Sequence, residues 1–396
     1  MCRMCEGTDF KLVINFGENP LVNSLIEKED LDKQEPTFPL VVRQCQNCRL
    51  VQVTDIVDSH EIYKNVDYLY FSGDMPNLKE YFAQFAGEIK KYMGEDDLIV
   101  EIGSNDGIFL DFFKNRLGVD PASNVVVRAL KNGIPTIADF FSERLARTIR
   151  REYGTAKVIG GSNCIAHLND LRDLMEGVVE LLADDGVFFV ECNYWGGMVQ
   201  NNNYALIYHD HFSYFSLQNW IDFLKGYGMT VFDATVTPAQ GGSLRLFACK
   251  DGRAKTERFQ DLVQYETDTN LNTYDTCIEY RIAVKREAKN LKGLIKGLKD
   301  SGKTIAGYGA AAKGFSVLKL AGIDQTHISY FVDDSPAKQG KYTPVTHIPV
   351  ISRDKAQEKL PDYFFITAPN YEQVIIEKEK AKGYEGKFIT VDCRII

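Results

Sequence analysis

The chain has 396 residues, of which 44% are hydrophobic and 26% charged, and its formal net charge is -9. This length exceeds what one hydrophobic core usually organises, so we expect two or three domains. The acidic balance argues against a general nucleic-acid-binding protein. The sequence has no apolar run long enough to span a bilayer, and residues 1–5 lack the apolar core of a secretory signal. We therefore expect a soluble cytoplasmic protein without a nucleic-acid or membrane partner.

Two Cys-x-x-Cys knuckles predict a metal site near the N-terminus. Cys2 and Cys5 form the first knuckle, and Cys45 and Cys48 form the second. Four thiolates with this spacing are typical of tetrahedral zinc, and a site closed by four protein ligands is structural. Four unliganded buried thiols, or a catalytic zinc ion, are the alternatives. The gap between the knuckles is long, so a loop or short strands must fill it.

Residues 98–107 predict a buried strand that runs into a glycine-containing turn, with a helix beginning near Ile108. An acidic residue ends this strand, and a second one ends the next predicted strand, near 118–120. The pattern is typical of a class I methyltransferase, whereas an NAD-binding fold would carry Gly-x-Gly-x-x-Gly. Such a turn lets the backbone approach a ligand, and the second acid is placed to hold the ribose hydroxyls of S-adenosylmethionine. The candidate cofactor ligands here are Glu101, Gly103, Asn105, Asp106 and Asp120.

The surrounding residues alternate between helix and strand patterns, as expected for an α/β domain. Helices are predicted over 78–92, from 121 onward and over 217–227; strands over 134–141, 157–167 and 187–191; a loop over 195–203; and an antiparallel hairpin over 229–234 and 244–249.

The octet 208–215, Tyr-His-Asp-His-Phe-Ser-Tyr-Phe, concentrates two of the chain's six histidines with a carboxylate and two tyrosines. Histidine is suited to taking a proton near neutral pH, and a tyrosine hydroxyl can donate to a developing oxyanion. The alternative is a polar loop with one metal-binding or core histidine.

The last part of the chain predicts a second α/β unit. Residues 251–300 are polar and helix-forming, and we expect one or two long helices that join the domains. Residues 304–314 predict a strand, a glycine turn and a helix start, where amide groups and Lys313 suit an anion such as a diphosphate. The alternative is a dinucleotide fold that has lost its ligand. Strands at 363–366 and 388–391 complete a small sheet.

The octet, the two knuckles, the turn at 98–107 and the run Gly307–Gly314 together resemble the sugar C-methyltransferases that act on nucleotide-linked 4-keto-hexoses. The resemblance implies three domains: a zinc module (1–75), a class I methyltransferase domain with a Rossmann-like sheet (76–250), and a Rossmann-like substrate domain (251–396). The sequence departs from the family at Asp210, where Glu is usual, and at Gln240, where many members have His.

The resemblance also implies roles for residues of the methyltransferase domain. His211 is expected to act as the base, with Tyr208, His209 or His167 donating to the enolate oxygen. The set of candidate catalytic residues is His211, Tyr208, His209, Asp210, His167 and Tyr70, with Tyr68 a weaker candidate than Tyr70. Asp139 and Asn163 are added as cofactor ligands, although an acid like Asp139 equally suits a helix N-terminus.

For the substrate, the family motifs imply contacts from Tyr308, Arg245, Lys338 and His347 in addition to Lys313. Lys338 and His347 could equally hold their loop in shape.

The expected function is S-adenosylmethionine-dependent methylation of a nucleotide-linked 4-keto-deoxysugar at the carbon next to the ketone, carbon 3, with structural zinc. The rival reactions are O-methylation of a sugar or another small molecule of surface-polysaccharide or natural-product biosynthesis. A scaffold without activity is a further alternative, against which the intact turn and octet argue. A monomer or weak homodimer is expected.

Overall fold

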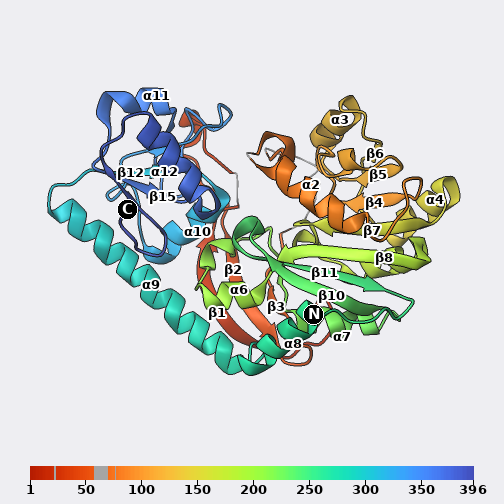
Figure 1. Cartoon of the computed structure of the whole chain (residues 1–396). Helices are drawn as coiled ribbons and strands as arrows, with labels where there is room; N and C mark the ends of the chain where they lie inside the picture. The colour runs from red at the N-terminus through yellow and green to blue at the C-terminus, as the bar shows by residue number, and fades with distance from the viewer. Residues whose placement is uncertain (22–23, 58–69, 76) are drawn as a thin grey trace.

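The computed structural model describes residues 1–21, 24–57, 70–75 and 77–396, which form three sheets with their helices (Figure 1). The N-terminal sheet has the strand order β1-β2-β3-β9. Its strands are β1 (Phe10–Asn19), β2 (Phe38–Cys45), β3 (Val51–Val53) and β9 (Ser213–Tyr214). Strand β9 is the end of the octet and pairs antiparallel with β3, Val51 facing Tyr214. The octet is therefore fastened to the zinc module.

The middle sheet has seven strands in the order β10-β11-β8-β7-β4-β5-β6. The parallel strands are β4 (Ile99–Ile102), β5 (Arg116–Val119), β6 (Thr136–Ile137), β7 (Ala156–Ser162) and β8 (Leu182–Asn193). Strand β11 (Ser243–Cys249) runs antiparallel to both of its neighbours, β8 and β10 (Thr230–Thr237). Strands β10 and β11 are the predicted hairpin.

Helices cover both faces of this sheet, so neighbouring residues on one strand are buried on opposite sides. In β7, Val158 belongs to the core under α2 (Leu78–Ile89), whereas Ile159 belongs to the core on the other face. Strands buried on both faces read as continuous apolar runs, which is what the sequence has here. The other helices are α3 (Ser123–Lys131), α4 (Glu143–Tyr153), α5 (Leu171–Leu181) and α7 (Leu217–Lys225).

Two predictions of local structure are wrong. In place of the helix near Ile108 there is a single 3-10 turn, η3 (Leu110–Phe112), because α2 already covers this face and Phe109 stacks on Phe85 with ring centroids 5.1 Å apart. Residues 195–203 are not simply a loop, since they include the short helix α6 (Trp195–Gln200). Trp195 is buried against Tyr280, which the sequence pattern does not reveal.

The C-terminal sheet is parallel, with the order β14-β13-β12-β15-β16. Its strands are β12 (Ile305–Tyr308), β13 (Phe331–Val332), β14 (Val350–Ile351), β15 (Tyr363–Ile366) and β16 (Lys387–Ile389), accompanied by α10 (Ala312–Ala321), α11 (Arg353–Ala356) and α12 (Glu372–Ala381).

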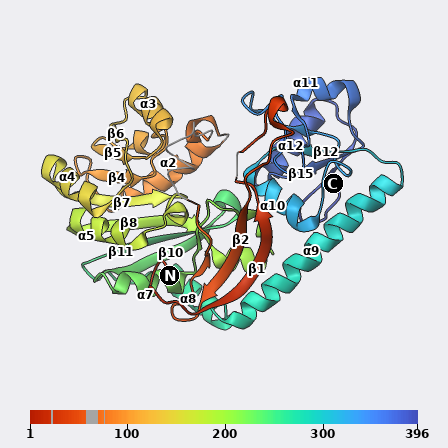
Figure 2. The same ribbon diagram turned by 180° about the vertical axis from the view of Figure 1, so that it is seen from behind.

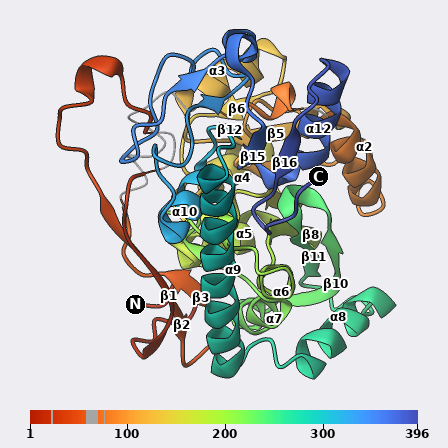
Figure 3. The ribbon, with the colours of Figure 1, turned by 90° about the vertical axis from the view of Figure 1, so that its left-hand side faces the viewer.

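Two helices join the middle and C-terminal domains, α8 (Glu257–Asp268) and the 27-residue α9 (Tyr274–Asp300). Helix α9 passes beside β1 and leads to the C-terminal domain, where it packs against α10 (Figure 3). It begins at Thr273, whose side chain accepts from the N–H of Thr276, and buries Val284, Ala288, Leu291 and Ile295 at helical spacing.

The zinc module also reaches the C-terminal domain, as the view from behind shows (Figure 2). Ile26 and Tyr342 exchange backbone hydrogen bonds of 2.8 Å, and Glu35 pairs with His347 at 2.5 Å. The zinc module and the C-terminal domain, which lie at opposite ends of the sequence, are thus in direct contact. The domain boundaries themselves remain predictions.

Candidate active site

A cavity of about 780 Å3 lies between the middle and C-terminal domains. Its walls come from the carboxyl ends of β4, β5 and β7, from the octet, and from the loops after β12, β13 and β15. In a parallel α/β sheet this edge is where ligands bind. The predicted site residues that line it are Tyr70, Gly103, Asn105, Asp120, Asn163, His167, Tyr208, Asp210, His211, Tyr308, Lys313 and Lys338.

The end of the cavity above β4 and β5 has the geometry of a cofactor site. Gly103 has a φ of 67°, and a Cβ there would collide with the side chain of Cys164. The carboxyl of Asp120 accepts the N–H of Asn105 and the N–H of Ala122, both at 2.9 Å. Burial raises the pKa of Asp120 to about 6. The two hydrogen bonds hold the carboxyl in the cavity wall, where its remaining lone pairs suit sugar hydroxyls.

Three predicted cofactor ligands lie outside the wall. Burial, with Asp120 and Asp106 nearby, raises the pKa of Glu101 well above its ordinary value, and its Oε2 has no hydrogen-bond partner among the described residues. Asp106 accepts the N–H of Gly73 at 3.0 Å and thereby holds the segment that follows Tyr70. Asp139 pairs with Arg144, in the first turn of α4, at 2.9 Å, whereas the N-cap of that helix is Ser142 and its first-turn acid is Glu143.

The tautomer of His211 follows from its hydrogen bonds. Nδ1 lies 2.7 Å from the backbone oxygen of Leu206, which can only accept, so Nδ1 carries the proton. Nε2 therefore has the lone pair, and it accepts from the Tyr208 hydroxyl at 2.7 Å. Desolvation, with His167 and Lys313 nearby, lowers the pKa of His211 well below its ordinary value. The imidazole is neutral and able to take a proton.

Two further groups of the predicted catalytic set lie beside His211. The ring of His167 is 4.9 Å from that of His211, and burial lowers its pKa to about 4 although it hydrogen-bonds the backbone at Asp210 and Asn163. Burial raises the pKa of Asp210 to about 7, and its Oδ1 has no hydrogen-bond partner in the described part of the chain. Both side chains line the cavity.

His209 is outside this group. Its Nε2 lies 3.2 Å from the backbone oxygen of Phe38, and it packs edge-on against the Phe38 ring. It faces the zinc module, so the structure does not support a role as donor to the substrate. Tyr68 lies outside the described residues.

The C-terminal wall contains three predicted substrate residues, and two of them also hydrogen-bond other residues of the C-terminal domain. Tyr308 donates to Glu379 at 3.0 Å, and Lys338 donates to the backbone oxygen of Ala310 at 3.0 Å and pairs with Asp333. Lys338 thus shapes its loop while it lines the cavity. Burial lowers the pKa of Lys313, at the start of α10, to about 7.

Arg245 and His347 do not line the cavity. Arg245 is buried on β11 and pairs with Glu191, and His347 pairs with Glu35 of the zinc module. A substrate contact predicted for either residue is not supported by this geometry, because each side chain is already engaged by a carboxylate elsewhere.

Sequence reasoning missed Asn193, which lines the cavity and lies 2.8 Å from His211 Nδ1 through its amide nitrogen. Because Nδ1 donates to Leu206, the amide oxygen of Asn193 is the end that suits this contact. The sequence signal that could have identified Asn193 is its position at the carboxyl end of a strand, β8.

The N-terminal cysteines converge as their spacing predicts. The Sγ atoms of Cys2, Cys5, Cys45 and Cys48 all lie within 4.8 Å of one another, with 3.4 Å between Cys2 and Cys48 and 3.6 Å between Cys5 and Cys45. Tetrahedral zinc with Zn–S bonds of about 2.3 Å requires similar separations. The four residues fit a structural zinc ion.

The seven-stranded sheet, its β4–β5 ligand edge and the cysteine cluster define a class I S-adenosylmethionine-dependent methyltransferase with a zinc-binding domain. Three family models match the chain: a zinc binding domain over residues 2–63, a methyltransferase domain over 77–234 and a C-methyltransferase C-terminal domain over 238–391. The C-methyltransferase NovU of Streptomyces niveus is 32% identical over 387 residues, 96% of this chain and 92% of that protein. The chain belongs to this family of C-methyltransferases.

Solved structures resemble part of the chain. A methyltransferase of Clostridium acetobutylicum has 12% identity, a TM-score of 0.34 and covers 46% of this chain and 94% of its own. The magnesium protoporphyrin IX methyltransferase of Synechocystis has 12% identity, a TM-score of 0.33 and covers 48% and 88%. None of the helices in the described part of the chain is long and apolar enough to cross a membrane.

Proposed function

We propose that this C-methyltransferase acts on a nucleotide-linked 4-keto-deoxysugar and methylates carbon 3, next to the ketone, through an enolate that His211 generates. The observation that carries the proposal is the neutral His211, whose Nε2 lone pair lies in the cavity beside the Tyr208 hydroxyl. Carbon acids next to a ketone are acidic enough for such a base.

The β4–β5 end of the cavity would hold S-adenosylmethionine. Asp120 would take the ribose hydroxyls, the Gly103 backbone would lie against the ligand, and Asn163 would border the methionyl end. When bound, S-adenosylmethionine supplies the methyl group to the nucleophilic carbon.

His211 and Tyr208 have different roles in enolate formation. The proton on carbon 3 moves to Nε2, and its electron pair forms the enolate. The hydroxyl of Tyr208 leaves Nε2 and donates to the enolate oxygen, which stabilises the charge that develops there. His167 and Asp210 border the same space, and the low dielectric around all four groups strengthens each hydrogen bond.

The C-terminal wall holds the nucleotide end. Lys313 stands in the first turn of α10, where helix N-terminal amides and a cation suit a diphosphate. This placement leaves the sugar between α10 and the octet.

The test is a mass-spectrometric screen of nucleotide-linked 4-keto-sugars for a methyl-mass gain, followed by exchange in deuterated water without methyl donor. A C-methyltransferase of this mechanism incorporates deuterium at carbon 3 before any methylation. Methylation without prior exchange, with the methyl group on oxygen, would identify an O-methyltransferase and refute the proposal.

A further inference from the structure

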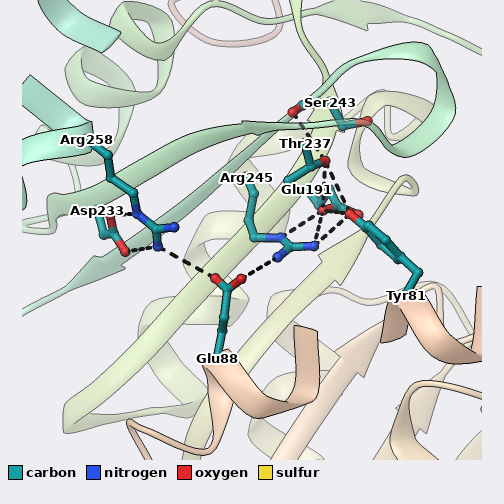
Figure 4. Close-up of polar contacts among 8 residues, drawn as sticks. All are labelled: Tyr81, Glu88, Glu191, Asp233, Thr237, Ser243, Arg245 and Arg258. Atoms are coloured by element: carbon teal, nitrogen blue, oxygen red, sulfur yellow. Dashed lines mark hydrogen bonds and ion pairs between the residues drawn. The ribbon is translucent and has the colours of Figure 1, made fainter. Parts of the chain in front are cut away.

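A chain of alternating charges lies between α2 and the middle sheet (Figure 4). Arg245 of β11 stands opposite Glu191 of β8 in the antiparallel register, and its Nε donates to Glu191 Oε2 at 2.8 Å. Its other nitrogens donate to Glu88 at 3.1 Å and to the Tyr81 hydroxyl at 2.6 Å, both on α2. Glu191 is fully buried and Arg245 is 4% exposed. Because a buried charge is stable only when it is paired and hydrogen-bonded, Glu191 depends on Arg245.

Glu191 in turn supports a residue of the cavity wall, Asn163. The backbone oxygen of Glu191 accepts the Asn163 N–H at 2.7 Å, and Asn163 Nδ2 lies 3.5 Å from Glu191 Oε1. Asn163 Oδ1 lies 3.3 Å from the Ser243 hydroxyl, which is also 3.0 Å from the backbone oxygen of Ala239. The side chains of Glu191 and Ser243 therefore lie against the two ends of the Asn163 amide.

The backbone of Asn163 needs this support. Its φ is 56°, a left-handed conformation that is uncommon outside glycine and that asparagine adopts more readily than other residues, and contacts from the surroundings hold it in place. The segment Gly-Gly-Ser-Leu-Arg provides such contacts because residues alternate along a strand. Ser243 and Arg245 share one face of β11, while Leu244 enters the core on the opposite face.

We propose that Arg245 is a positioning residue of the methyl-transfer site: acting through Glu191, it holds the left-handed turn at Asn163 against the cofactor end of the cavity. Arg245 itself does not line the cavity. The inference rests on the proposed position of the cofactor beside Asn163 and is independent of the identity of the methyl acceptor.

The test is a double-mutant cycle read by calorimetric binding of S-adenosylhomocysteine to the full chain. Arg245→Met and Asn163→Ala are each expected to weaken binding about tenfold, the effect of losing a charge-assisted contact. The double variant is expected to bind no more weakly than the weaker single variant, because both act on one turn. Losses that multiply in the double variant, or unchanged binding by Arg245→Met, would overturn the proposal.

Arg258→Met is the matched control. Arg258 pairs with the same Glu88, at 3.6 Å, and with Asp233, and among the described residues it reaches Glu191 only indirectly, through Glu88 and Arg245. We expect this variant to bind like the wild-type chain even where its melting temperature falls. An equal loss of affinity in Arg258→Met would show general destabilisation and would refute a positioning role.

If Arg245→Met does not fold, Arg245→Lys replaces it in the cycle. Lysine keeps the charge but cannot reproduce the fork that reaches Glu191, Tyr81 and Glu88 together, so we expect a folded variant with severalfold weaker binding and a lower melting temperature than the wild-type chain. Wild-type affinity in this variant would overturn the proposal. Asp120→Ala, measured in parallel, reports on the cofactor site itself: if it also binds normally, the proposed cofactor position is wrong rather than the path from Arg245.

Discussion

The hydrogen bond from His211 Nδ1 to a backbone carbonyl decides the chemistry of this imidazole. A carbonyl cannot donate, so the proton stays on Nδ1 and the Nε2 lone pair faces Tyr208 in the cavity. In a metal site the free nitrogen would bind an ion; here its neighbours are a tyrosine and His167.

His211→Ala is expected to abolish both methylation and deuterium exchange at the substrate carbon, while binding of S-adenosylhomocysteine survives. The variant removes the lone pair but leaves the β4–β5 end of the cavity intact. The measurement is the exchange assay by mass spectrometry, with calorimetry for the cofactor product. His209→Ala serves as the comparison, because His209 faces Phe38 outside the cavity and should exchange normally. Wild-type exchange in His211→Ala would place the base elsewhere.

The buried carboxyl of Asp210 predicts a pH dependence of stability. Burial raises its pKa from 3.8 to about 7, so the folded chain binds this proton more tightly than the unfolded chain does. The contribution to the free energy of unfolding is fully present below about pH 4 and is lost as the pH rises through about 7. Asp210→Asn should remove this loss. Urea unfolding of both chains from pH 4 to 8 measures it, and parallel curves would contradict a raised pKa for this buried carboxyl.

At the scale of elements, the zinc knuckles and the octet form one structural unit. Cys45 ends β2, β3 follows the second knuckle, and β3 pairs with β9 at the end of the octet. Arg3, between the ligands Cys2 and Cys5, donates to the backbone oxygen of Phe212 at 3.0 Å. The cysteine cluster is therefore close to the octet in structure, although it takes no part in the cavity wall.

Cys45→Ser is expected to lower zinc content and the melting temperature, because one thiolate of a closed four-ligand site is lost. Folded molecules of the variant should keep most of their affinity for S-adenosylhomocysteine. Elemental analysis and thermal unfolding measure the effect, and Cys393→Ser, outside the cluster, is the control. Purified wild-type chain without zinc would rule the site out.

For the whole molecule, the cavity is divided between two domains, so the proposed cofactor site and the proposed substrate site come from different parts of the chain. The proposed cofactor ligands lie at the ends of β4, β5 and β7, and the C-terminal wall comes from the loops after β12, β13 and β15. A change in the C-terminal wall should therefore affect one ligand and spare the other.

Lys313→Met is expected to raise KM for the nucleotide-linked sugar by about tenfold or more, the effect of losing a charged hydrogen bond. Affinity for S-adenosylhomocysteine should stay the same. Steady-state kinetics and calorimetry test the two halves separately. A loss of cofactor affinity with an unchanged KM would show that the cofactor lies at the C-terminal wall and the sugar nucleotide at the β4–β5 end.

Local signals were sufficient for a large part of this architecture. Cysteine spacing predicts the four residues whose thiols converge, and the strand-and-turn pattern predicts the β4 edge with Gly103 and Asp120. The resemblance of the octet points to His211 and Tyr208, which line the cavity. Apolar periodicity predicts strands of the middle and C-terminal sheets, because that pattern reports directly which face of each element is buried. For the N-terminal sheet, the sequence supports only the expectation of a loop or short strands. The site roles themselves remain predictions that the variants above test.

Only the tertiary structure decided which polar residues face the ligand. Arg245, His209 and His347 belong to motifs of the family, yet each turns away from the cavity toward a partner far along the chain: Glu191, Phe38 and Glu35. Asn193 lines the cavity and contacts His211, although it belongs to none of the motifs recognised in the sequence. The direction of a buried polar side chain depends on which distant group satisfies its hydrogen bonds, and that choice is made when the domains pack together, beyond the reach of local sequence patterns.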